Sequence, residues 1–146
     1  NLLYLFHNWY KDQPKLFKKY VYCIISQIFY FAISIRSKFQ MDKNLKIMLA
    51  QLNPIVGDLE NNSKIILETY KKASKNKVDI LAFPEMFLSG YQIQDLVFSP
   101  AFQKDLEKYI RFIGKHCVNN TYLLLGSPVV EKKQIFNAYL LLISNN

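Results

Sequence analysis

A short apolar run that stops at a proline constrains the fold of this chain most. Residues 78–83 read Val-Asp-Ile-Leu-Ala-Phe, and Pro84 and Glu85 follow at once. The length and the apolar character of the run are typical of a buried strand. Proline has no N–H to donate to a strand ladder, so the strand is predicted to end there. Glu85 is therefore predicted to lie at the carboxyl end of a strand, where open α/β sheets bind their ligands.

Two interpretations of Glu85 stay open at this point. A carboxylate at the apolar end of a strand costs free energy unless something uses it. A catalytic base is one such use, and perturbed carboxylates gather at functional sites. The alternative is an ordinary surface charge on a helix or loop, and position alone does not decide between the two.

Strands and helices alternate through the rest of the body. Strands are predicted at residues 46–52, 78–83, 121–125 and 135–143, and helices at residues 59–74 and from residue 99 onward. Asp58 is predicted as the N-cap of the first helix, and Pro100 suits the first turn of the second. A polar turn at residues 131–134 is predicted to join the last two strands in a hairpin. This order predicts an α/β fold whose sheet has parallel and antiparallel parts.

Each predicted helix carries an apolar stripe at helical spacing, which indicates a face turned to the core. The stripe of the first helix comprises Leu59, Ile66, Tyr70 and Ala73, and that of the second comprises Phe102, Leu106, Tyr109, Ile110 and Ile113.

The first 40 residues differ from the body in composition. Their apolar run at residues 20–35 has basic residues on both sides and is shorter than the roughly 20 residues that a membrane helix needs. Met41 is a natural translation start just before the first regular strand. We therefore predict a hydrophobic, basic leader at residues 1–40 that is not part of the fold, and a domain at residues 41–146. A functional anchor or an amphipathic surface helix is the alternative.

Charge and cysteine usage exclude several function classes. The net charge is +8, but much of it belongs to the leader, so no nucleic-acid partner is predicted. The two cysteines, Cys23 and Cys117, and the two histidines, His7 and His116, form neither a metal-ligand spacing nor a disulfide framework. No metal site is predicted, and the expected compartment is a reducing cytoplasm. Cys117 is predicted to be a small buried hydrophobe at a helix end.

Several short stretches in a fixed order resemble one known family. They are residues 50–54 with 56–59, 83–85 with 89–91, 95–96 with 100–102, and 125–128 with 136–138. Together they resemble the start of a nitrilase-superfamily (carbon–nitrogen hydrolase) domain, and within it most closely the glutaminase domain of the glutamine-dependent NAD+ synthetase family. The match departs mildly at Ser89, Gln92 and Ile93, where that family more often has Thr and two prolines.

The resemblance implies a four-layer αββα sandwich, of which this chain holds about the first half, with helices on one side of a mixed sheet. It also implies a Glu–Lys–Cys catalytic set in which Glu85 is the general base, and a place for Tyr91 in the loop that lines the glutamine pocket. The implied lysine and cysteine fall beyond residue 146. Lys132, Lys133 and Cys117 are not assigned those roles, so the chain alone is predicted to be inactive.

For a full-length enzyme the resemblance implies glutamine and nicotinic acid adenine dinucleotide as substrates, ATP and Mg²⁺ as cofactors, and a homo-oligomer. No cofactor is implied for the fragment itself. Alternatives are a fragment of another carbon–nitrogen hydrolase such as an amidase, a nitrilase-like domain of a membrane acyltransferase, and a decayed module without catalysis.

Overall fold

The computed structural model describes residues 45–117, 120–131 and 134–143. The predicted leader at residues 1–40, the start at Met41, and Lys132 and Lys133 lie outside the described residues. The division into residues 1–40 and 41–146 therefore stays a prediction.

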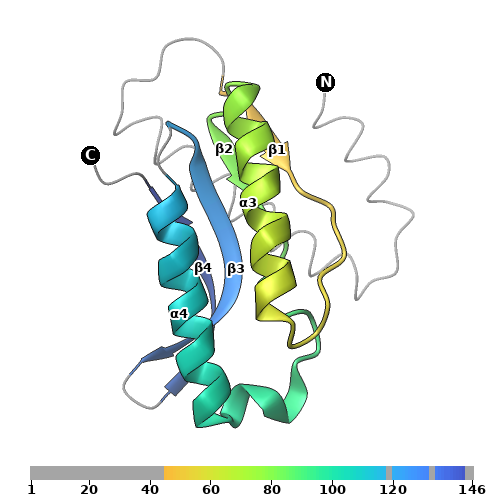
Figure 1. Ribbon diagram of the computed structural model, residues 1–146, viewed down its shortest axis with the longest axis vertical. Helices are drawn as coiled ribbons and strands as arrows, with labels where there is room; N and C mark the ends of the chain where they lie inside the picture. Colours follow the sequence, from red (N-terminus) through yellow and green to blue (C-terminus); the bar gives the residue numbers. More distant parts are fainter. Residues whose placement is uncertain (1–44, 118–119, 132–133, 144–146) are drawn as a thin grey trace, which may run out of the picture. The chain divides into compact units, whose positions relative to one another are not determined.

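Four strands and three helices make up the described part of the chain. In chain order they are β1 (Ile47–Leu49), α3 (Leu59–Lys75), β2 (Ile80–Ala82), the 3₁₀ helix η1 (Gln94–Phe98), α4 (Pro100–His116), β3 (Tyr122–Glu131) and β4 (Gln134–Leu142). Figure 1 shows α3 and α4 side by side in front of the strands. The predicted alternation of strands and helices is confirmed.

The strands form one mixed sheet in the order β1-β2-β3-β4. β2 pairs in parallel with β1 and β3, whereas β3 and β4 form an antiparallel hairpin. Both helices lie on the same side of this sheet (Figure 1). The predicted mixed sheet with helices on one side is thereby confirmed, and β2 is central, with all three of its residues buried.

The predicted boundaries need several corrections. β2 spans Ile80–Ala82 and not residues 78–83, because the N–H of Val78 donates to the carbonyl of Ala73 at the end of α3 (3.0 Å). β3 does not end at Leu125 but continues through Gly126 and Pro128 to Glu131, because β4 supplies antiparallel partners along that whole length. β1 spans only Ile47–Leu49, and its pairing with β2 closes with the bond from the N–H of Ala50 to the carbonyl of Ala82 (2.9 Å). The helix η1 was not predicted.

The core lies between the helices and the sheet. All four stripe residues of α3 are buried, as predicted. In α4 the stripe residues Phe102, Leu106 and Ile113 are buried, whereas Tyr109 and Ile110 are partly buried and pack against the core. None of the helices within the described residues is long and apolar enough to cross a membrane.

Apolar side chains remain exposed on the two edge strands, β1 and β4, and near the end of the inner strand β3. They are Ile47 and Leu49 in β1, Val130 near the end of β3, and Phe136 and Leu141 in β4. Exposed apolar side chains on a sheet are suited to further packing. The sheet therefore matches one half of a sandwich better than a finished two-layer domain.

Candidate active site at the end of β2

Glu85 lies just beyond the carboxyl end of the central strand. The last ladder bond of this segment runs from the N–H of Phe83 to the carbonyl of Leu124 (2.9 Å), and Pro84 then ends the pairing. A tight turn follows over residues 85–89, in which Met86 takes a positive φ of 56°. Glu85 is half-buried, and its carboxylate makes a solvent-exposed hydrogen bond.

Gly126 lets this turn lie directly on β3. A Cβ atom at Gly126 would come within 2.4 Å of the carbonyl oxygen of Pro84, 2.6 Å of the Cα of Glu85 and 2.8 Å of the N of Met86. No real side chain tolerates such distances to backbone atoms. The close approach therefore requires glycine, and it fixes the backbone at Glu85 against the neighbouring strand.

The carboxylate of Glu85 accepts a hydrogen bond from a side chain far along the chain. Nδ2 of Asn137 in β4 donates to Oε1 of Glu85, across a separation of 52 residues. An ionised carboxylate has acceptors only, so the amide nitrogen of Asn137 must face it. The sheet thus brings together Glu85, from the end of β2, and a donor from β4.

A buried asparagine links the two loops that lie beside this turn. Nδ2 of Asn62 donates to the carbonyls of Ile55 (2.7 Å) and Leu88 (3.0 Å), and its Oδ1 accepts from the N–H of Ile55 (2.9 Å). The side chain of Asn62 is fully buried. Because Asn62 lies on α3, the helix ties the loop after β1 to the turn after β2.

A second contact joins the same two loops through their backbones. The N–H of Gly57 donates to the carbonyl of Ser89 (2.8 Å). Gly90 has a φ of +80°, and a Cβ there would lie 2.5 Å from the Cα of Val56. Tyr91 follows immediately and is 50% exposed. Its predicted part in binding glutamine stays a prediction.

Cys117 is the buried thiol that the sequence predicts. It caps the carboxyl end of α4 and is almost wholly buried. Burial raises the pKa of the Cys117 thiol from an ordinary 9.0 to about 11. At neutral pH this thiol is protonated and lacks the thiolate that a nucleophile needs.

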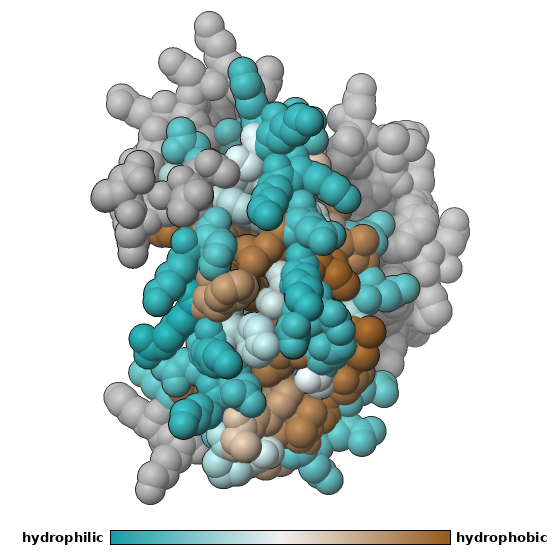
Figure 2. All heavy atoms as spheres, viewed as in Figure 1, coloured by the Kyte–Doolittle hydropathy of each residue, from teal (hydrophilic) through white to brown (hydrophobic). Residues whose placement is uncertain are grey.

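The described residues hold no group of three His, Cys, Asp or Glu side chains that a metal ion would need. A hollow of about 880 Å³ lies between α3 and α4. Charged side chains of both helices flank it, and Figure 2 shows them in teal around a more apolar floor. The groove is lined by Lys64, Lys71, Lys104, Lys108, Arg111, Lys115, Glu60, Glu68, Glu107, Ser63, Leu67, Tyr109 and Phe112. Glu85 is not among these residues.

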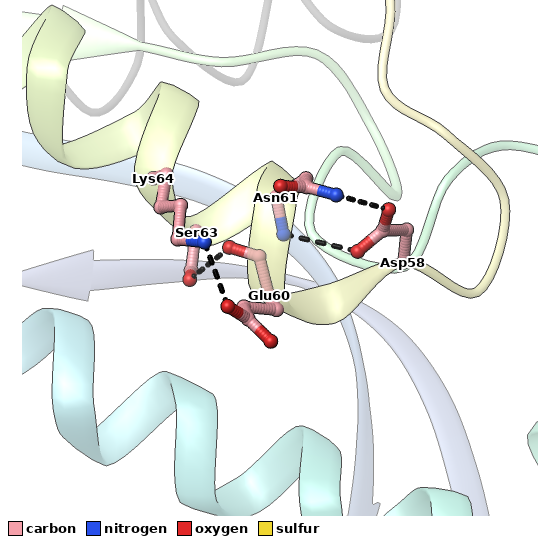
Figure 3. A network of polar contacts seen from close by, with 5 residues as sticks. All are labelled: Asp58, Glu60, Asn61, Ser63 and Lys64. Carbon is pink, nitrogen blue, oxygen red and sulfur yellow. Dashed lines mark hydrogen bonds and ion pairs between the residues drawn. The ribbon is translucent and has the colours of Figure 1, made fainter.

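An exposed polar network surrounds the amino end of α3 (Figure 3). Asp58 accepts hydrogen bonds from the N–H of Asn61 (3.0 Å) and from its Nδ2 (2.6 Å), which confirms the predicted N-cap. These bonds, the backbone one first, lower the pKa of the Asp58 carboxyl. Nζ of Lys64 lies 2.7 Å from Oε1 of Glu60, in an ion pair open to solvent.

Sequence reasoning missed two residues that shape this site. Asn62 interrupts the apolar stripe of α3 at a position three residues after Leu59, and a polar residue at a core position is a readable signal of a buried hydrogen-bond network. Asn137 lies in one of the stretches that carry the family resemblance, but no role was assigned to it. Its partner depends on strand register, which no local pattern reveals.

Comparison with known proteins places this geometry in a family. The sequence model of the carbon-nitrogen hydrolases matches residues 46–146, well over half of the chain. Over 99 residues the chain is 37% identical to a glutamine-dependent NAD(+) synthetase of Rhodobacter capsulatus, covering 68% of this chain and 18% of that protein. It is 42% identical over 88 residues to the enzyme of the same name from Aquifex aeolicus, covering 60% and 15%.

Solved structures agree with the sequence comparison. A glutamine-dependent NAD(+) synthetase from Cytophaga hutchinsonii superposes with a TM-score of 0.65 at 27% identity, over 70% of this chain and 17% of that one. An amidase from Nesterenkonia shares the fold at a TM-score of 0.51 and 20% identity, over 62% and 35%. The chain thus resembles a part of glutamine-dependent NAD(+) synthetase and spans less than a fifth of the curated relatives it matches.

Proposed function

Since this chain belongs to the carbon–nitrogen hydrolase family, we propose that it supplies the general base of a glutamine-hydrolysing site, and that Glu85 is that base. The observation that carries the proposal is the place of Glu85, half-buried just past the end of the central strand. Its backbone is fixed on Gly126 and its carboxylate is held by a hydrogen bond. A base needs such a fixed position and one accessible oxygen.

In the proposed reaction Glu85 accepts the proton of a cysteine thiol. The resulting thiolate attacks the side-chain carbonyl of glutamine. The proton held by Glu85 passes to the leaving nitrogen, the C–N bond breaks, and a thioester forms as ammonia leaves. A lysine would stabilise the oxyanion of the tetrahedral intermediate. Water then releases glutamate and restores the thiol. Cys117 does not serve as the nucleophile, because it is buried and protonated. The family resemblance implies that the thiol and the lysine lie beyond residue 146.

We further propose that Tyr91 contacts glutamine, as an exposed aromatic ring in the loop held by Gly90.

The released ammonia would serve an amidation of nicotinic acid adenine dinucleotide that depends on ATP and Mg²⁺, in a cytoplasmic homo-oligomer. Neither ATP nor Mg²⁺ fits the described residues, because they form no metal-ligand group and the sequence has no glycine-rich phosphate loop.

Glutamine hydrolysis by the product of the complete reading frame tests the proposal. Ammonia release is measured for the unaltered protein and for Glu85→Gln, which keeps the shape of the side chain but cannot accept the proton. We expect kcat/KM to fall by roughly 10²–10⁴-fold, the usual contribution of a positioned base. Glu131→Gln, which neutralises an exposed carboxylate at the end of β3, is the matched control and should behave as the unaltered protein.

Two outcomes would contradict the proposal. Full glutamine turnover in Glu85→Gln would remove Glu85 from the mechanism. Turnover of simple aliphatic amides without turnover of glutamine would favour an amidase in its place.

A further inference from the structure

We propose that Asn137 is the positioning residue of the Glu85 base, and that it assigns separate tasks to the two carboxylate oxygens. The inference rests on the proposed function and extends it to a residue for which the sequence predicts no role. Oε1 of Glu85 accepts the hydrogen bond from Nδ2 of Asn137. Oε2 is then the oxygen that takes the proton of the thiol.

The pairing of β3 with β4 places Asn137 on the face of the sheet on which the turn carrying Glu85 lies. Gly126 and Pro128 are two residues apart in β3, so their side-chain positions share one face. The direction of a Cβ at Gly126 points at the backbone of Pro84 and Glu85. Asn137 is the antiparallel partner of Pro128, and directly opposed residues lie on the same face of a sheet. Asn137 and the turn that carries Glu85 therefore meet on one face.

Two rigid connections fix the distance between the amide and the carboxylate. The turn is seated on Gly126 by backbone contact, and Asn137 is placed relative to Gly126 by the ladder, in which Gly126 pairs with Tyr139 and Pro128 with Asn137. Strand backbones hold side chains more tightly than loops do. The contact between Glu85 and Asn137 is thus set by the hairpin and not by a flexible segment.

The chemistry of an amide suits this task better than that of other donors. A carboxamide donates N–H bonds at every pH near neutrality and takes no proton itself, so it does not compete with Glu85 as a base. It also adds no charge, unlike Lys or Arg, whose attraction would hold the carboxylate in its ionised form. Asn137 therefore orients the base without placing a full opposite charge beside it.

The exposure of Asn137 separates positioning from stability. Asn137 is exposed and Glu85 is half-buried, so loss of their contact removes little from the folding free energy. The geometry of the base, in contrast, is lost when its carboxylate rotates freely. A misplacement of about 1 Å costs up to about 10²-fold in rate. The expected signature is a fall in kcat with little change in KM or in the unfolding midpoint.

The test measures glutamine hydrolysis by the product of the complete reading frame and by three variants. We expect Asn137→Ala to lower kcat by roughly 10- to 100-fold and to leave KM for glutamine and the unfolding midpoint unchanged. Asn137→Asp has the same shape, lacks the donor and places a second carboxylate beside the first, so it should lose at least as much. Gln134→Ala, at an exposed position of the same strand, is the control and should retain the original kcat.

The possible failures are distinct. Full activity in Asn137→Ala together with its loss in Glu85→Gln would overturn the role of Asn137 and leave the proposed function intact. A lower unfolding midpoint that accounts for the loss of activity, or a rise in KM with constant kcat, would also overturn it. Absence of glutamine turnover in the unaltered protein would overturn the proposed function and this inference together.

Discussion

Two neighbouring asparagines on α3 lie in opposite environments. Asn61 belongs to the solvent-exposed network at the amino end of the helix, where its bonds to Asp58 remain within one turn (Figure 3). Asn62 points inward, is fully buried, and joins three backbone groups from two separate loops. The residue type and the helix are the same, so the difference lies in desolvation and in what each side chain connects. Only the inward residue supports the turn that follows β2.

Truncation of the two asparagines tests this comparison most strongly. Asn62→Ala removes the side-chain partner of the Ile55 N–H and of the Leu88 carbonyl. The carbonyl of Ile55 loses one of two bonds and keeps the one from the N–H of Asp58. We expect the free energy of unfolding to fall by about 3 kcal/mol. Asn61→Ala removes one exposed bond, while its backbone N–H still donates to Asp58, so only a small part of that loss is expected. Urea unfolding of both variants, compared with the unaltered chain, measures the difference. Equal losses at the two positions would mean that burial is not what distinguishes them.

Cys117 is a buried group that can ionise, so its burial should make the stability of the protein depend on pH. The raised pKa, about 11 in the folded chain, means that folded protein keeps a proton that unfolded chain loses near pH 9. The resulting stability is fully present below pH 9 and is lost as pH rises through 11, by about 2.7 kcal/mol in total. Unfolding free energies at pH 8 and pH 11 for a Cys23→Ser protein, with and without Cys117→Ala, isolate this effect. If both proteins lose the same stability over this interval, the buried thiol is not responsible.

Asp58, at the surface, should change the free energy of unfolding with pH in the opposite direction to Cys117. This effect should be the smallest of the three. Hydrogen bonds from Asn61 lower its pKa below 3.8 in the folded chain. Its contribution to stability is therefore present above the unfolded value and disappears as pH falls through the folded one. Asp58→Asn keeps the capping geometry but not the charge, so its stability should depend less on pH between 5 and 2. Because the group faces solvent, added salt should reduce the difference, and an effect that persisted in high salt would contradict this account.

The sequence predicts the elements whose signal is local. The apolar stripe of α3, the N-cap at Asp58 and the strand that ends at Pro84 each follow from residues within one or two turns, and all three occur in the structure. The end of β3 was predicted wrongly because Gly126, Ser127 and Pro128 have turn-like composition. Pairing with β4 overrides that composition, and pairing is a long-range property.

The site was predictable only in part, because some of its contacts depend on long-range strand pairing. A strand that stops before Glu85 indicates where the carboxylate lies, and the family resemblance indicates what it does. The contact with Asn137 depends on the register of a hairpin, and the seat on Gly126 depends on how two strands approach each other. Neither leaves a periodic pattern in the sequence. The role of Asn62 is partly predictable. Its polar side chain within an apolar stripe indicates a buried hydrogen-bond network, but the sequence does not indicate its partners.

The register of the hairpin limits how the length of this chain can change in evolution. Adding or removing one residue in β3 after Gly126, or in β4 before Asn137, would turn the Asn137 side chain to the opposite face of the sheet. The same change between Glu131 and Gln134 leaves the paired residues opposite one another. Related chains that keep both Gly126 and Asn137 should therefore vary in length at the tip of the hairpin and not along its stem.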